Sequence, residues 1–252
     1  MELTGAIGYP LSPQQELAWQ TLAGTPAQHA SVLVRIAGAI DSARLRRALT
    51  AVVARHEILR TEFVAQTGRR LPLQVIRPDA AVLFHERDLR GADEREQMRE
   101  VDAIRRELLA DPCDGGSTAA PRAALITLRD QKHLLVLVAP AMCADAETLQ
   151  VLVAQAAQAY AGAAAGEDPV QYADFSEWQR QELDSTDAAA AAARERWAQS
   201  TNAADDLPFL GDAALRDDGP FSAAAVDTVL DRDVADAVDA LARSAGVPVD
   251  RV

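Results

Sequence analysis

The sequence predicts an α/β fold in which a mixed sheet is flanked by helices. Of the 252 residues, 49% are hydrophobic, which is enough for a sizeable core. The apolar pattern changes repeatedly between the spacing of strands and that of helices. A continuous apolar stretch at 134–138 is typical of a central strand buried on both faces. Disordered, collagen-like and disulfide-scaffold proteins are excluded by the same composition.

The first 110 residues contain clear start signals for their elements. Ser12 and Pro13 mark the beginning of a helix, and Asp41 is the expected N-cap of another. Gly68 lies between two short apolar segments, as in a hairpin turn. In order, we expect a helix at 14–22, a strand at 31–40, a helix at 42–56, hairpin strands at 61–65 and 71–76, an extended segment at 82–85 and a helix at 93–109.

The helix at 93–109 is highly charged and has one narrow apolar stripe. We expect the following side chains to form its buried face, leaving the opposite face solvated: Met98, Val101, Ile104 and Leu108. A polar loop is expected at 111–120.

A loop at 140–145 stands between a strand and a helix. It follows the carboxyl end of the central strand, where open α/β sheets usually carry their chemistry. From residue 121 onwards we expect hairpin strands at 121–128 and 133–139, this loop, helices at 146–160, 172–183 and 188–197, a strand at 221–230 and a helix at 234–245. Asp187 should cap the third helix, and Asp250 should begin a further one as the sequence stops.

The charge balance argues against several partners. The 25 basic and 38 acidic residues give a net charge of −13, so nucleic acid and anionic membrane surfaces are poor partners. No segment resembles a signal peptide or a membrane span, which predicts a cytoplasmic protein. Cys113 and Cys143 are too few for a disulfide framework, and no bound metal is expected.

Four segments resemble, in order, the core motifs of condensation domains of nonribosomal peptide synthetases. They are SPQQELAW at 12–19, RHEILRTEF at 55–63, the loop ending at Asp145, and YADFSEWQ at 172–179. Alone, each would be explained by core aromatics or a solvated helix end. The shared order makes coincidence improbable.

The resemblance implies a chloramphenicol-acetyltransferase-like fold of two lobes. Donor and acceptor, each tethered to a carrier protein by phosphopantetheine, meet in a tunnel between the lobes. In this chain we expect an N-terminal lobe at 1–200, a connector at 201–218 and the truncated start of the second lobe at 219–252, which is about half of that architecture. No cofactor is expected, because phosphopantetheine arrives only as the substrate arm of a carrier protein.

The third motif departs from the family pattern. Active members carry two histidines, three variable residues, an aspartate and a glycine, and the second histidine assists attack by the acceptor amine. The matching residues here are Pro140, Ala141, Met142, Cys143, Ala144, Asp145 and Ala146. Both histidines are replaced, so the loop offers no catalytic residue. A positioned acid or base is typically worth about a hundred- to ten-thousandfold in rate.

Asp145 is the motif residue that remains. The family pattern implies a structural ion pair between Asp145 and Arg60, and loss of one partner of a buried pair costs about 3–5 kcal/mol. Other branches are also disfavoured, because heterocyclisation members carry an aspartate at position 140 and oxygenase-recruiting members an arginine at position 141. Epimerisation members keep both histidines.

Replacement chemistry by Cys143 is not supported by the sequence. A thiolate nucleophile needs a nearby base, and His133 lies about ten residues earlier on the same hairpin. We therefore expect a buried, inert thiol. His29, His56 and His85 show no spacing typical of a metal site or a catalytic triad.

Two functions remain open at this point. The first is a noncatalytic condensation-like lobe, a pseudoenzyme that contacts a neighbouring adenylation or carrier domain or forms a homodimer through its exposed edge. The second is an active peptide-bond-forming transferase whose second lobe lies outside this chain. Two arginine clusters are candidate docking patches, with ordinary solvated side chains as the alternative: Arg44, Arg46 and Arg47, and Arg99, Arg105 and Arg106.

Overall fold

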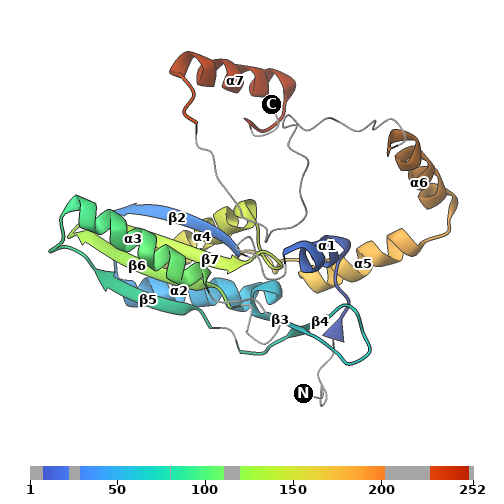
Figure 1. Cartoon of the computed structure of the whole chain (residues 1–252), viewed down its shortest axis with the longest axis horizontal. Helices are drawn as coiled ribbons and strands as arrows, with labels where there is room; N and C mark the ends of the chain where they lie inside the picture. The colour runs from blue at the N-terminus through green and yellow to red at the C-terminus, as the bar shows by residue number, and fades with distance from the viewer. Residues whose placement is uncertain (1–7, 23–28, 80, 111–119, 202–227, 250–252) are drawn as a thin grey trace, which may run out of the picture. The chain divides into compact units, whose positions relative to one another are not determined.

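The computed structural model describes residues 8–22, 29–79, 81–110, 120–201 and 228–249. The chain divides into two compact units, Met1–Pro220 and Phe221–Val252. The first unit contains two sheets and most of the helices, and the second contains one described helix (Figure 1).

A four-stranded mixed sheet forms the centre of the first unit. The strand order is β2 (His29–Ala37), β7 (Lys132–Pro140), β6 (Arg122–Arg129) and β5 (Leu83–Asp88). The β2–β7 and β7–β6 pairs are antiparallel, whereas β5 and β6 are parallel. The predicted hairpin is confirmed, and β7 has a neighbour on each side, as its continuous apolar sequence indicated.

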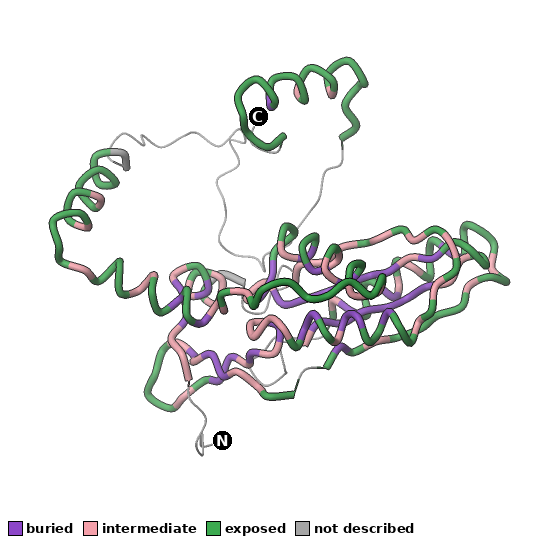
Figure 2. The backbone as a smooth tube through the Cα atoms, turned by 180° about the vertical axis from the view of Figure 1, so that it is seen from behind, coloured by how far each residue is buried: buried purple, intermediate pink, exposed green. Residues whose placement is uncertain are grey.

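Helices cover both faces of this sheet (Figures 1 and 2). On one face, α2 (Ser42–Arg55) and α4 (Ala146–Ala161) pack against the odd-numbered side chains of β6 and β7. On the other face, α3 (Glu94–Leu109) packs against the even-numbered ones. Aspartates cap all three helices, because Asp41, Asp93 and Asp145 each accept a main-chain N–H three residues on.

The predicted buried face of α3 is wrong at one position. Met98 is 68% exposed, while Gln97 is only 8% exposed. Gln97 lies on the same stripe as Val101, Ile104 and Leu108, and its Nε2 donates to the carbonyls of Leu89 at 2.8 Å and Leu128 at 3.0 Å. The polar side chain is buried because those two carbonyls need a donor.

A second, three-stranded sheet has the order β1 (Gly8–Tyr9), β4 (Leu73–Ile76) and β3 (Thr61–Val64), all antiparallel. The β3–β4 hairpin is the one expected from the sequence, with Gly68 at φ +83°. The short 3-10 helix η2 (Glu57–Arg60) leads from α2 into β3. That the hairpin pairs with the N-terminal segment in a separate sheet was not expected.

Three further helices have the predicted positions. They are α1 (Pro13–Leu22), α5 (Tyr172–Asp184) and α6 (Ala188–Thr201). Asp187 caps α6 by accepting the N–H of Ala190 at 2.8 Å. In the second unit, the expected helix is α7 (Arg232–Ala245), which ends at Gly246 with φ +67°.

Some expectations fall on residues that are not described. Of the strand expected at 221–230, residues 228–230 are not in a strand, and the rest lies outside the described residues. Most of the polar loop at 111–120, together with Cys113 and Asp250, also lies outside the described residues. Among the described helices, none has both the length and the apolar composition needed to span a bilayer.

Candidate functional site

The loop 140–145 forms a tight turn between β7 and α4. The main-chain N–H groups of Cys143 and Ala144 both donate to the carbonyl of Pro140, at 2.8 and 3.0 Å. Cys143 and Ala144 are buried, and Ala141 is half-buried. The turn brings the chain from the central strand directly into the first residue of α4, Ala146.

Asp145 is held at the N-terminus of α4. Its Oδ1 accepts the N–H of Thr148 at 2.8 Å and the hydroxyl of Thr148 at 2.7 Å. The main-chain bond, then the hydroxyl, lowers the pKa of the Asp145 carboxyl below its ordinary value of 3.8. The carboxylate therefore accepts a main-chain N–H in the first turn of α4 that would otherwise lack a hydrogen-bond partner.

The ion pair predicted between Arg60 and Asp145 is not formed. Arg60 instead pairs with Glu57, Nη2 to Oε1 at 3.0 Å, and its Nη1 donates to the carbonyl of Arg77 at 2.5 Å. Glu57 lies one turn earlier on η2, so Arg60 finds a carboxylate locally. Meanwhile the extended conformation of Asp145 directs its carboxylate into the first turn of α4.

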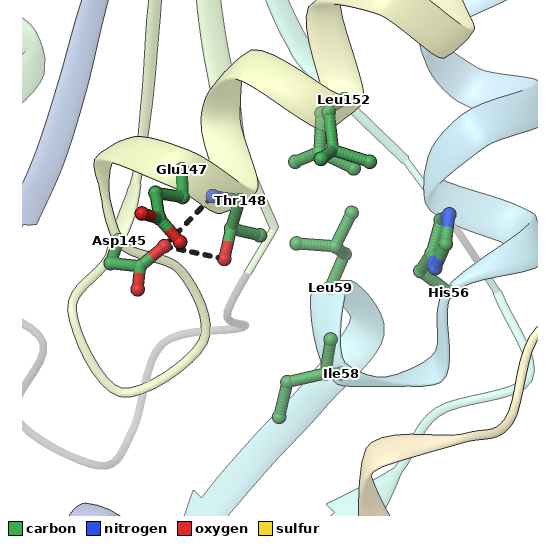
Figure 3. A pocket seen from close by; sticks show the side chains of 8 residues that line it. His56, Ile58, Leu59, Asp145, Glu147, Thr148 and Leu152 are labelled. Atoms are coloured by element: carbon green, nitrogen blue, oxygen red, sulfur yellow. Dashed lines mark hydrogen bonds between the residues drawn. The ribbon is translucent and has the colours of Figure 1, made fainter. Parts of the chain in front are cut away.

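A cleft of about 300 Å³ lies between η2 and the start of α4 (Figure 3). Leu59 and Leu152 project between its two sides, with Asp145 and Glu147 on one side and His56 on the other. The eight residues lining the cleft are His56, Ile58, Leu59, Asp145, Glu147, Thr148, Val151 and Leu152. The cleft is thus mainly apolar, with two carboxylates on one side.

Three of the chain's four histidines are remote from the loop or bound elsewhere. His56 lines the cleft, and its Nε2 bonds to Oε1 of Gln155 at 2.7 Å. His133 lies at the opposite end of β7 from the loop, with its Nδ1 3.1 Å from the hydroxyl of Thr127. His85 is exposed on the edge strand β5.

The fourth histidine, His29, lies directly opposite Pro140 in the β2–β7 register. Its Nε2 is 2.9 Å from Nη2 of Arg122, and since arginine only donates, the imidazole accepts this bond. His29 shares the α3 face of the sheet with Ser31, whose hydroxyl accepts a bond from Arg105 on α3. It therefore faces away from α4, the helix that the loop enters.

Sequence reasoning missed His29 because the proximity depends on strand register. Residues 29 and 140 are far apart in the chain, and no local pattern specifies that β2 pairs with β7 at this offset.

Cys143 packs in an apolar cluster with Leu11 and Phe63. Its 8% exposure and the position of His133 fit the expectation of an inert thiol, although its reactivity remains a prediction. Within the described ranges, no three His, Cys, Asp or Glu side chains gather as a metal site requires. At position 141 the loop offers only a methyl group, which can neither accept nor donate a proton.

The family model for the condensation domain matches residues 7–252. The chain belongs to the condensation-domain family of nonribosomal peptide synthetases. It is 32% identical over 181 residues to the chondramide synthase of Chondromyces crocatus, a match that covers 68% of this chain and 5% of that protein. The isonitrile lipopeptide synthase of Mycobacterium tuberculosis is 32% identical over 202 residues, a match that covers 75% of this chain and 8% of that protein.

Two solved structures share this fold. SgcC5 from Streptomyces globisporus has a TM-score of 0.73 and 26% identity, covering 95% of this chain and 56% of that one. The X-domain from teicoplanin biosynthesis, solved in complex with OxyB, has a TM-score of 0.63 and 27% identity, covering 81% and 45%. The chain thus has the chloramphenicol-acetyltransferase-like α/β fold of the family, and it spans about half the length of these solved structures.

Proposed function

We propose that this condensation domain is noncatalytic and that it serves a nonribosomal peptide synthetase system as an interaction or structural module. The observation that supports this most is Ala141, which stands where active members have the histidine that assists amine attack. The surrounding loop is well packed, and Asp145 caps α4 through its bonds to Thr148. The change therefore removes a catalytic group and leaves an ordered loop.

Two of the chain's histidines support the same proposal. A replacement base must reach the reacting amine directly or through one water. His56 is bonded to Gln155, and His133 lies at the far end of β7. Without such a base, a factor of about a hundred to ten thousand in rate is lost.

A neighbouring synthetase domain, such as an adenylation or carrier domain, is the partner we propose. The relatives are parts of far longer synthetases, since this chain matches only 5% of the chondramide synthase. The related X-domain was solved with a protein partner, OxyB. Members that recruit oxygenases carry an arginine at position 141, and Ala141 makes that class of partner less suitable here. A cytoplasmic location is part of the same proposal.

Binding without turnover is the expected behaviour. The natural protein containing this chain would be mixed with donor and acceptor carrier proteins loaded with aminoacyl groups, together with an adenylation domain of the same synthetase system. Calorimetry should detect association with at least one of these domains, while mass spectrometry detects no amide product above the uncatalysed level. Amide formation at enzymatic rates, or no association with any of them, would refute the proposal. Sedimentation of the protein alone separates homodimerisation from partner binding.

A second candidate function is an active transferase whose other lobe lies outside this chain. One observation bears on it: His29 lies directly opposite Pro140 at the start of the loop, with its imidazole bonded to Arg122 and facing away from α4. Positioning alone can also supply several kcal/mol of barrier reduction. If this alternative holds, amide formation occurs and His29→Gln reduces it about a hundredfold or more, beyond any loss of stability that follows from the altered bond to Arg122.

A further inference from the structure

A buried hydrogen-bond network links the loop 140–145 to the rest of the first unit. Its centre is Gln15 on α1, which is 3% exposed. The Nε2 of Gln15 donates to the carbonyl of Met142 at 3.1 Å and to Oε1 of Gln74 at 3.1 Å. Its Oε1 accepts the N–H of Ser12 at 3.0 Å. The amide therefore uses both donors and its acceptor, and one donor reaches the loop.

The network is fixed from several elements at once. Gln74 on β4 is 1% exposed and donates to the carbonyl of Pro10 at 2.8 Å. From α5, the hydroxyl of Tyr172 is 2.8 Å from that of Ser12, and the hydroxyl of Ser176 donates to the same Pro10 carbonyl at 3.2 Å. The amide of Gln15 is thus held in one orientation, because its neighbours are themselves bonded and buried.

The contact to Met142 is a directional bond made to the middle of the loop from α1. Leu11 and Phe63 hold Cys143 by apolar packing, which sets position but not orientation. The bonds from Cys143 and Ala144 to Pro140 lie within the turn and would move with it. Because a fixed donor outside the loop binds the Met142 carbonyl, it determines how the peptide plane between Met142 and Cys143 is turned. The orientation of this plane in turn sets where Ala141 lies.

We propose that Gln15 is a positioning residue that fixes the course of the loop after β7 through the Met142 carbonyl. Through this bond the first and fourth sequence motifs act on the third. The role concerns the geometry of residues 141–143, so it holds whether or not the domain catalyses amide formation. It is independent of the proposed function, and its test needs no turnover.

The test compares two buried glutamines. Gln15→Met removes the donors to Met142 and Gln74 while keeping a similar side-chain volume. Gln97→Met is the matched control, because Gln97 is also buried and its Nε2 also donates to two acceptors, the carbonyls of Leu89 and Leu128, on a different part of the unit. Both substitutions are expected to reduce global stability, which urea unfolding measures.

Two local readouts then separate positioning from stability. The first is the rate at which a thiol reagent labels Cys143 under native conditions, read on the peptide that contains it. The second is hydrogen exchange at the amides of Cys143 and Ala144. In Gln15→Met, both rates should rise about tenfold or more beyond what the lowered global stability of that variant explains. In Gln97→Met, they should rise only as far as global stability predicts.

A carboxyl variant keeps the test open if Gln15→Met fails to fold. In Gln15→Glu, the protonated carboxyl still donates one hydrogen, whereas the ionised form faces the oxygens of Met142 and Gln74 with none. Relative to the wild type at the same pH, exchange at Cys143 and Ala144 should therefore accelerate as pH rises through the titration of this residue. Equal local rates in the Gln15 and Gln97 variants, after correction for stability, or exchange in Gln15→Glu that is independent of its ionisation, would overturn the proposal.

Discussion

At the scale of single residues, Asp145 acts as a helix cap. Its Oδ1 accepts two bonds from Thr148. Asp145→Ala should lower the free energy of unfolding by about 1 kcal/mol at neutral pH, because α4 loses its N-cap. Asp145→Asn keeps an acceptor at the cap and is the control, with a much smaller loss. Urea unfolding measures both, and equal losses in the two variants would contradict a capping role.

The same carboxyl predicts a pH dependence. Its pKa in the folded protein lies below the ordinary 3.8, chiefly because of the bond from the Thr148 main chain. The stabilisation is therefore present above the unfolded pKa and is lost as pH falls through the folded pKa. The stability difference between the wild type and Asp145→Asn should shrink as pH falls below about 4. A difference that is constant with pH would show that the charge has no role.

Arg60 and Asp145 should be energetically independent. The structure gives Arg60 its own partners, Glu57 and the Arg77 carbonyl. Arg60→Ala should cost about 1 kcal/mol, less than the 3–5 kcal/mol expected for a buried ion pair. Combined with Asp145→Asn, the losses should add within about 0.5 kcal/mol. Coupling well above 1 kcal/mol in this double-mutant cycle would restore the ion pair expected from the family pattern.

At the scale of elements, α3 provides a paired prediction. Gln97→Met should cost about 1–3 kcal/mol, because the buried carbonyls of Leu89 and Leu128 lose their donor. Met98→Gln should change stability by less than about 0.5 kcal/mol, because that side chain is 68% exposed. Both are measured by urea unfolding. A larger cost at Met98 than at Gln97 would support the apolar stripe expected from the sequence.

Elements were predictable where the signal is local. The Asp41 and Asp187 caps and the turn at Gly68 were correctly expected, because each depends on residues within one turn. The cap by Asp145 was not expected, because the family pattern gave that residue a different partner. Gln97 was not expected inside, since its burial depends on carbonyls contributed by other segments. The separate β1–β4–β3 sheet was missed for the same reason, because strand pairing is a long-range property.

At the scale of the whole molecule, the family pattern predicted the loop but not its surroundings. The four motifs led to the condensation-domain family, which the family model confirms over residues 7–252. In the structure Arg60 pairs with Glu57 and not with the expected Asp145, and the approach of His29 to Pro140 was not foreseen. Motifs specify which residues matter, whereas register and the nearest available partner decide what they contact.

Charge also gives a prediction at this scale. The protein has a net charge of −13, so an acidic carrier protein would need a local basic patch on its surface to dock against. On α2, the side chains of Arg46 and Arg47 are exposed. Within the described residues, their guanidinium groups form no hydrogen bond or ion pair. The guanidinium of Arg44, in contrast, lies 5.0 Å from the centre of the Tyr160 ring. Arg46→Glu with Arg47→Glu should weaken carrier binding about tenfold at low salt and less at high salt.

The comparison for this patch is the other candidate patch, where Arg99→Glu with Arg106→Glu changes the charge equally on α3. Weakening by this second pair alone would place carrier docking on α3 instead of α2. Binding is measured by calorimetry at two salt concentrations. Equal weakening by the two pairs would show an effect of net charge alone, and no weakening by either would remove both patches from consideration.

The central claim is that this domain lost its catalysis with the imidazole at position 141. Single-turnover amide formation between loaded donor and acceptor carrier proteins tests it most directly, using the natural protein that contains this chain and its Ala141→Gly variant. We predict that both give product no faster than the carriers alone. A rate far above that background, abolished by His29→Gln, would contradict the account.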